Sequence, residues 1–146
     1  MELNENERID DLQYKGLKII QNKEEFCFGI DSVLLSDFAK EIKNNSRAID
    51  LGTGTGILAI LLTAKSNLLE ITGIEIQKKM VELANRNVQL NNMQNKIKIV
   101  NADIKNLNKI FQANSFDVVI TNPPYKKINT RNSKYQYWKI NIKAWN

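Results

Sequence analysis

Strand-like and helix-like segments alternate along the chain between residues 48 and 121. Apolar strand patterns occupy residues 48–51, 71–76, 97–100 and 116–121. Helical patterns occupy residues 56–65 and 77–90, and a short one around Leu107 precedes the last strand. This alternation predicts a parallel sheet joined by right-handed crossovers, with helices on both faces. We expect an α/β fold in which the four strands stand in the spatial order 3-2-1-4.

The predicted helix over residues 77–90 has the clearest amphipathic pattern in the chain. Its buried side is expected to carry four residues, Met80, Leu83, Ala84 and Val88. On its polar side, Glu82 and Arg86 stand four residues apart, which predicts an ion pair within the helix.

Residues 1–30 are expected to form an N-terminal extension. The first ten residues are polar and acidic, which predicts a loose start. Apolar residues at 17–20 and 26–28 flank a polar turn, so we expect a hairpin there. A helix should then begin at Asp31 or Ser32 and end near residue 44. Its buried face is expected to carry Val33, Leu34, Phe38 and Ile42.

The positive net charge of the chain, +5, is concentrated at its C-terminus. Residues 126–146 contain six Lys or Arg residues and no acidic residue, together with both tryptophans. This change in composition predicts a boundary near Lys126, followed by a basic, aromatic tail. The tail is either a native RNA-binding arm or foreign sequence from a frameshift, an early stop or an artificial chain end. Alternation of apolar and polar residues over 138–144 predicts a strand covering the open edge of the fourth strand, or else an unordered tail.

The composition excludes several kinds of chemistry. The chain has no histidine and a single cysteine, Cys27, so a zinc site of cysteine and histidine ligands is impossible. Ser-His-Asp and Cys-His mechanisms are excluded for the same reason. We expect no metal site, no membrane segment and a cytoplasmic location, because the N-terminus is acidic and no apolar run approaches the ~18 residues of a membrane-spanning helix.

A glycine-rich motif, Asp50-Leu51-Gly52-Thr53-Gly54-Thr55-Gly56, lies between the first strand and the helix after it. Glycine at every second position lets the backbone turn tightly and lets a ligand approach closely. The spacing G-x-G-x-G differs from the dinucleotide motif G-x-G-x-x-G. An acid at position 50 would repel a pyrophosphate but suits the ammonium of an amino-acid group. The alternative is a glycine-rich turn without a ligand.

Two further acids follow the next two strands. Glu75 ends the second strand and could accept both hydroxyls of a ribose, or it could be a solvated carboxylate. Asp103 follows the third strand, where it could accept a hydrogen bond from an adenine amino group or cap the next helix.

The fourth strand ends in Asn122-Pro123-Pro124-Tyr125. The prolines restrict the backbone and remove N–H donors, so the carbonyls there can only accept hydrogen bonds. An amide oxygen with a neighbouring carbonyl can hold both hydrogens of an exocyclic amino group, and Tyr125 offers a stacking face for a base. The alternative is a Pro-Pro turn that ends an ordinary strand.

Together, these motifs resemble the class I S-adenosylmethionine-dependent methyltransferase family over residues 48–125. The resemblance implies a Rossmann-like fold, a doubly wound parallel sheet, and S-adenosylmethionine as cofactor. It implies that the methionine part is held by Asp50, Gly52 and Gly54, the ribose by Glu75 and the adenine by Asp103. It also implies that the catalytic motif consists of Asn122, Pro123 and Tyr125, with Asn122 orienting the target nitrogen.

The N-terminal region resembles a narrower group, the bacterial tRNA(Val) adenine-N6 methyltransferases. The similar segments are Asp10-Asp11-Leu12, Ile19-Ile20-Gln21, Phe28-Gly29-Ile30-Asp31-Ser32-Val33-Leu34-Leu35 and Phe38-Ala39. This resemblance implies tRNA as partner and methylation of the adenine beside the anticodon. Release-factor glutamine methyltransferases and DNA adenine methyltransferases are the alternatives, although the first usually carry an N-terminal helical bundle and the second a target-recognition domain.

The family's sheet continues after the fourth strand, so we expect this chain to supply only the N-terminal half of the fold, with residues 31–125 as a partial methyltransferase domain. Two hypotheses follow. The chain is an adenine-N6 methyltransferase, which needs no strong general base because a sulfonium is a good leaving group. Alternatively, it is a truncated fragment that keeps the fold or the cofactor contacts without turnover.

Overall fold

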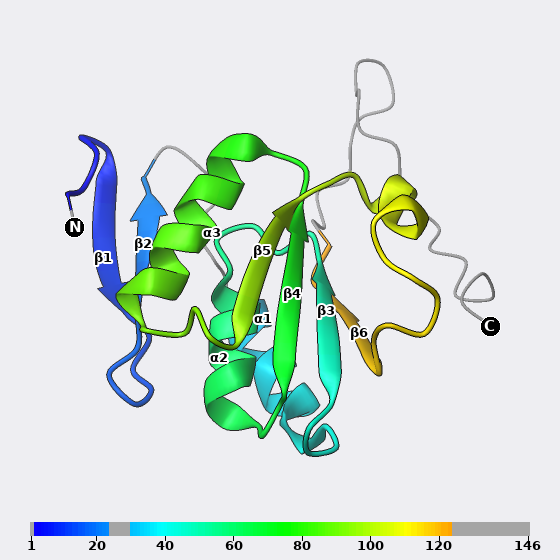
Figure 1. The fold of residues 1–146 in the computed structure, drawn as a ribbon. Helices are drawn as coiled ribbons and strands as arrows, with labels where there is room; N and C mark the ends of the chain where they lie inside the picture. Colours follow the sequence, from blue (N-terminus) through cyan, green and yellow to red (C-terminus); the bar gives the residue numbers. More distant parts are fainter. Residues whose placement is uncertain (1, 24–29, 124–146) are drawn as a thin grey trace, which may run out of the picture.

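The computed structural model describes residues 2–23 and 30–123 of the chain. A four-stranded parallel sheet forms its centre (Figure 1). The strands are β3 (Arg47–Leu51), β4 (Glu70–Glu75), β5 (Ile97–Asn101) and β6 (Val118–Thr121). Their spatial order is β5-β4-β3-β6, which confirms the predicted order 3-2-1-4. The predicted basic tail and the strand expected over 138–144 lie outside the described residues.

The register of the sheet aligns the carboxyl ends of its strands. Leu51 of β3 pairs with Ile74 of β4 on one side and with Thr121 of β6 on the other. Glu75 in turn pairs with Asn101, the last residue of β5. The loops that leave the four strands therefore begin at the same edge of the sheet.

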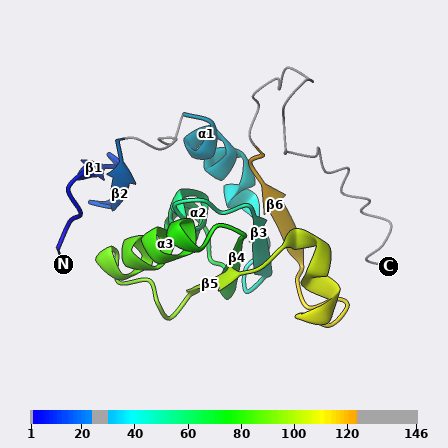
Figure 2. The ribbon, with the colours of Figure 1, turned by 90° about the horizontal axis from the view of Figure 1, so that it is seen from above.

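Three helices cover one face of the sheet (Figure 2). They are α1 (Ile30–Phe38), α2 (Ile57–Lys65) and α3 (Lys78–Leu90). The first six residues of α2 are all buried, as expected for a helix enclosed between the sheet and its neighbours. The main core lies here, where α2 packs against residues such as Ala48, Ile71 and Ile120 of the sheet.

A smaller layer covers the opposite face. Leu107 of the 3-10 helix η2 (Ile104–Lys109) packs against Ile49, Leu51 and Ile74. The rings of Phe111 and Phe116 meet edge to face beside this cluster, with their centroids 5.1 Å apart. Because β3 alternates its side chains between the two layers, both of its faces are buried.

An antiparallel hairpin precedes the sheet and differs from the predicted one. The strand expected at 17–20 is present as β2 (Lys18–Asn22), but its partner is β1 (Glu7–Asp11). The expectation of a loose start was therefore wrong for Glu7–Asp11. The connecting turn is closed by hydrogen bonds from Leu12 N–H to Leu17 O at 2.9 Å and from Leu17 N–H to Tyr14 O at 2.9 Å. The strand expected at 26–28 lies outside the described residues.

Helix α1 also departs from its predicted face. It begins at Ile30 and is followed by a 3-10 turn, η1 (Ala39–Glu41). Leu34 and Phe38, expected inside, are 57% and 87% exposed. Ser32 and Ser36 are buried in their place. Ser36 Oγ accepts a hydrogen bond from Lys65 Nζ at 2.8 Å, so a small hydroxyl turned inward gives the end of α2 a polar partner.

Candidate functional site

The glycine loop between β3 and α2 has a backbone that only glycine adopts easily. Gly52, Gly54 and Gly56 have φ angles of 77°, 55° and 81°, all in the left-handed region. The N–H groups of Gly52 and Thr53 both donate to Ile74 O at 2.9 Å, which ties the loop to the end of β4. The predicted tight turn is therefore confirmed, and its geometry requires the alternating glycines.

The three glycines face different surroundings. A Cβ built on Gly52 or Gly54 would meet no atom within 4 Å, so the space beside these residues is open. A Cβ on Gly56 would lie 3.4 Å from Ala84 Cβ, which shows that Gly56 packs against α3. The first two glycines leave room for a ligand, and the third lets a helix approach the loop.

Asp50 lies beneath the loop and is 1% exposed. Its Oδ2 accepts a hydrogen bond from Thr53 Oγ1 at 2.7 Å. Its Oδ1 is buried and has no hydrogen-bond partner among the described residues. Burial, reinforced by the nearby charge of Glu75, raises the pKa of Asp50 to about 6. A buried carboxylate oxygen without a donor fits a site that receives a cationic or N–H-bearing ligand.

Glu75 is buried at the end of β4, with only 7% of its surface exposed. Its Oε2 accepts from Gly54 N–H at 3.1 Å, and its Oε1 accepts from Gln77 N–H at 2.9 Å. The carboxylate therefore bridges the glycine loop and the residue that precedes α3. This contradicts the alternative of a solvated carboxylate.

Asp103 stands at the end of the loop after β5, where it caps η2. Its Oδ1 accepts from Lys105 N–H at 2.9 Å. The capping interpretation of Asp103 is therefore confirmed, and its expected contact with adenine stays a prediction. Nearby, Asn101 Nδ2 donates to Glu75 O at 2.9 Å and holds the ends of β4 and β5 together.

Asn122 follows β6 and is half-buried. Its Nδ2 donates to Ser32 Oγ of α1 at 3.2 Å. The preceding residue is anchored to β3, because Thr121 Oγ1 donates to Leu51 O at 2.8 Å. Pro123 is exposed, and Tyr125 lies outside the described residues.

These predicted residues come together at one edge of the sheet. Leu51 and Thr121 are paired, so Asn122 begins its loop beside Gly52, while Glu75 contacts Gly54 directly. In open α/β sheets, ligands bind at the carboxyl ends of the strands, where the strand order reverses. Here β4 and β5 extend the sheet on one side of β3 and β6 on the other, so the reversal lies between β3 and β6. The arrangement can hold a polar ligand over the loop and a second group beside Asn122.

Sequence reasoning missed two residues that shape this edge. A Cβ on Gly73, in the middle of β4, would lie 2.8 Å from Thr53 Oγ1, so only glycine leaves room for Thr53 above the strand. A glycine inside a buried strand signals such a close approach. Asn87, completely buried on α3, donates to Thr55 O in the loop at 2.9 Å. Its signal was a polar residue on the inward side of an amphipathic helix.

Residues 2–23 and 30–123 hold no group of three or more Cys, Asp or Glu side chains placed to bind a metal ion. Within the same part of the chain, none of the helices has the length and apolar character needed to cross a bilayer.

Comparisons with known proteins agree on one family. The methyltransferase small domain family matches residues 27–142. Proteins named tRNA1(Val) (adenine(37)-N6)-methyltransferase from Tolumonas auensis and Pseudoalteromonas translucida are 32% and 33% identical, each over 77% of this chain and 46% of the relative. A Methanococcus maripaludis structure described as an S-adenosyl-L-methionine-dependent methyltransferase matches with a TM-score of 0.56 and 26% identity. The match covers 63% of this chain and 41% of that one.

The chain thus spans about half the length of the curated relatives it matches. The family match covers well over half of this chain, and it includes the glycine loop, Glu75, Asp103 and Asn122. The chain belongs to the methyltransferase small domain family, with the Rossmann-like fold of S-adenosylmethionine-dependent methyltransferases.

Proposed function

We propose that this chain binds S-adenosylmethionine at the carboxyl edge of its sheet and takes part in methylating an amino nitrogen. The observation that carries the proposal is the buried Asp50 Oδ1, which lacks a donor beneath a loop with open space at Gly52 and Gly54. The ammonium of an amino-acid group would supply that donor and would favour the charged form of Asp50. When bound, S-adenosylmethionine supplies an activated methyl group on its sulfonium.

The other acids complete the proposed binding site. Glu75 uses one lone pair of each oxygen for Gly54 N–H and Gln77 N–H, so each oxygen can still accept a ribose hydroxyl. Asp103, held by its cap to η2, would accept a hydrogen bond from the adenine amino group. The backbone bonds to Glu75 place its carboxylate before the ligand arrives, which lowers the cost of ordering the site.

Asn122 would orient the target nitrogen. Its amide oxygen and a neighbouring backbone carbonyl would accept both hydrogens of an exocyclic amino group. The nitrogen lone pair would then point out of the base plane, toward the methyl group, and the proton would leave to water after attack. Positioning of this kind contributes most of the rate in such reactions, which agrees with a chain that lacks histidine.

For the substrate we propose adenine N6 of tRNA, beside the anticodon. The support is the name shared by the relatives at about 30% identity, together with the motif at Asn122. A cytoplasmic location would follow from such a substrate. A glutamine side chain or a DNA adenine offers the same kind of amino nitrogen, so substrate assays should include both.

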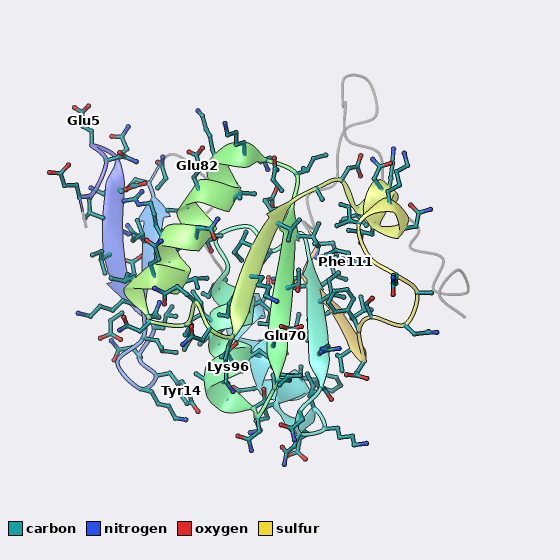
Figure 3. The ribbon with its side chains drawn as sticks, in the orientation of Figure 1. Glu5, Tyr14, Glu70, Glu82, Lys96 and Phe111 are labelled. Atoms are coloured by element: carbon teal, nitrogen blue, oxygen red, sulfur yellow. The ribbon has the colours of Figure 1, made fainter. Side chains whose placement is uncertain are left out.

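Binding of the demethylated product, S-adenosylhomocysteine, tests the cofactor site by calorimetry. Glu75→Ala should weaken binding about tenfold or more, because both ribose hydroxyls lose their acceptor. Glu70→Ala is the matched control, since Glu70 lies at the amino end of the same strand, away from the site (Figure 3). Equal affinities for the wild type and Glu75→Ala would refute the assignment.

Methyl transfer to unmodified tRNA tests the second half of the proposal. Asn122→Ala should abolish turnover and leave the affinity for S-adenosylhomocysteine nearly unchanged. Wild-type turnover in this variant would remove Asn122 from the mechanism. Cofactor binding without turnover in the unaltered chain would instead identify it as a cofactor-binding portion of a longer enzyme.

A further inference from the structure

A fully buried asparagine connects three separate parts of the molecule. Asn87 lies on the inward side of α3 among apolar neighbours such as Leu83, Ala84 and Val88. A buried amide without partners is costly, so its hydrogen bonds determine what packs around it. Its Oδ1 accepts from Ile20 N–H at 2.6 Å, and its Nδ2 donates to Ile20 O at 3.2 Å and to Thr55 O at 2.9 Å.

Asn91, one helical turn later, binds the same strand in the same way. Its Oδ1 accepts from Lys18 N–H at 3.0 Å, and its Nδ2 donates to Lys18 O at 2.7 Å. Four residues of helix rise about 6 Å and two residues of strand about 6.6 Å, so the two amides match alternate residues of β2.

These amides occupy the edge of β2 that β1 leaves open. Neighbouring odd-numbered residues bond toward β1, through Leu12 N–H to Leu17 O and Lys23 N–H to Asn6 O, both at 2.9 Å. The even-numbered Lys18 and Ile20 therefore turn their backbone groups toward α3. In Figure 1, β2 lies between β1 and α3. The side-chain amides of α3 thus bond to the backbone of β2 at the edge where a third strand would otherwise pair.

Of these two amides, Asn87 alone also bonds to the glycine loop among the described residues. Its partner Thr55 O lies one residue before Gly56, where an added Cβ would lie 3.4 Å from Ala84 Cβ of α3. We propose that Asn87 is a positioning residue for the cofactor loop, which it braces against both α3 and the N-terminal hairpin. This inference rests on the proposed function, because the loop is where the cofactor would bind.

The hydrogen bond from Asn87 to Thr55 O restricts the glycine loop before a ligand binds. A loop with three glycines has many accessible backbone conformations, and ordering it on binding would weaken affinity. A buried hydrogen bond to the loop carbonyl removes part of that freedom in advance. Docking of the hairpin, through Ile20, holds the same amide in its orientation. The N-terminal hairpin therefore contributes to cofactor affinity without touching the cofactor.

The test compares Asn87→Ala with Asn91→Ala in the full chain. Each variant loses two hydrogen bonds to β2. Of the two, Asn87→Ala alone also loses the hydrogen bond to Thr55 O in the glycine loop. Hydrogen exchange should speed up in β2 for both variants, and in residues 52–56 by about tenfold or more for Asn87→Ala alone. Exchange in β5 and η2 serves as the reference, because general destabilisation would raise it equally. An osmolyte that favours the folded state is added to every sample.

Calorimetry with S-adenosylhomocysteine provides the second measurement. Asn87→Ala should weaken binding about tenfold, whereas Asn91→Ala should bind like the wild type. Unchanged loop exchange in Asn87→Ala, or equal losses of affinity in the two variants, would overturn the proposal. If the wild type does not bind S-adenosylhomocysteine, the proposed function fails, and loop exchange by itself decides whether Asn87 braces the loop.

Discussion

Helices α3 and α1 lie on the same face of the sheet, and both bury polar residues, but they differ in where their apolar residues lie. Helix α3 buries a polar residue, Asn87, beside its apolar ones. Helix α1 buries two serines and leaves an apolar stripe exposed within the described part of the chain. That stripe consists of Ile30, Leu34 and Phe38, which are 68%, 57% and 87% exposed.

This difference shows that the elements packed against a helix determine which of its residues are buried. The side of α3 that carries Asn87 and Asn91 meets β2, whose backbone groups require hydrogen-bond partners, and the two amides supply them. Helix α1 meets the end of α2, where Lys65 requires a polar contact. Lys65 Nζ donates to Ser36 Oγ at 2.8 Å and pairs with Asp37 at 3.0 Å. A polar group therefore joins the buried apolar residues of α3, whereas in α1 buried serines take the place of Leu34 and Phe38.

The largest effect is expected from Asn87→Leu, which makes the buried face of α3 entirely apolar. The apolar pattern alone predicts stabilisation. We expect a loss of about 3 kcal/mol in the free energy of unfolding, because Ile20 N–H and Thr55 O lose their partner and leucine branches into a filled space. Urea unfolding measures the change. A variant as stable as the wild type would show that the buried amide is dispensable.

The corresponding change in α1 is Ser36→Leu. Leucine suits a buried helix position in general, but Ser36 is completely buried and bonds to Lys65 of α2, so we expect a larger side chain to overpack the contact. We expect a loss of about 2 kcal/mol in thermal or urea unfolding, from overpacking and from the lost bond to Lys65. Ser36→Ala, which removes only the hydroxyl, separates the two causes. An unchanged stability in Ser36→Leu would mean that α1 can shift away from α2.

Acid should loosen the hairpin on the α3 side. Arg86 does not pair with Glu82 as predicted but holds Glu7 of β1, with Nη1–Oε1 and Nη2–Oε2 distances of 2.7 Å and 2.8 Å. The hydrogen bond from Arg86 lowers the pKa of Glu7 below its ordinary value of 4.5. Ionised Glu7 therefore stabilises the fold above that value, and the contribution is lost as pH falls through the lowered pKa.

Glu7→Gln tests this expectation. At neutral pH it should cost about 1 kcal/mol, since the pair is largely buried but reaches the surface. Between about pH 5 and about pH 3, the wild type should lose more stability than the variant, because the variant has no proton to bind at this position. Parallel acid-dependence of the two proteins would contradict the role of the ion pair.

The smallest effect is expected on the exposed stripe of α1. Leu34→Gln keeps a good helix former and removes an exposed apolar side chain, so the free energy of unfolding should change by less than about 0.5 kcal/mol. Self-association at high concentration should decrease, because exposed apolar area promotes it. Light scattering and urea unfolding measure the two quantities. A loss comparable to that of Ser36→Leu would place Leu34 in the core after all.

By itself, the sequence determined the parallel sheet, its strand order and the edge at which Asp50, Gly52, Gly54, Glu75 and Asn122 gather. These features follow from local patterns: strand and helix periods, glycines that require positive φ, and the handedness of crossovers. The same local signals located α2, α3 and the four strands of the parallel sheet to within a residue or two.

Only the tertiary structure decided which strand pairs with β2, which face of α1 is buried and which partner Arg86 binds. Each of these depends on residues far apart in the sequence, such as Glu7 with Arg86 and Ile20 with Asn87. The spacing of apolar residues in a segment indicates which face of that segment favours burial. It carries no information about a distant backbone group that needs a hydrogen bond. Because an unpaired buried polar group costs more than an exposed leucine, those distant groups decided the outcome.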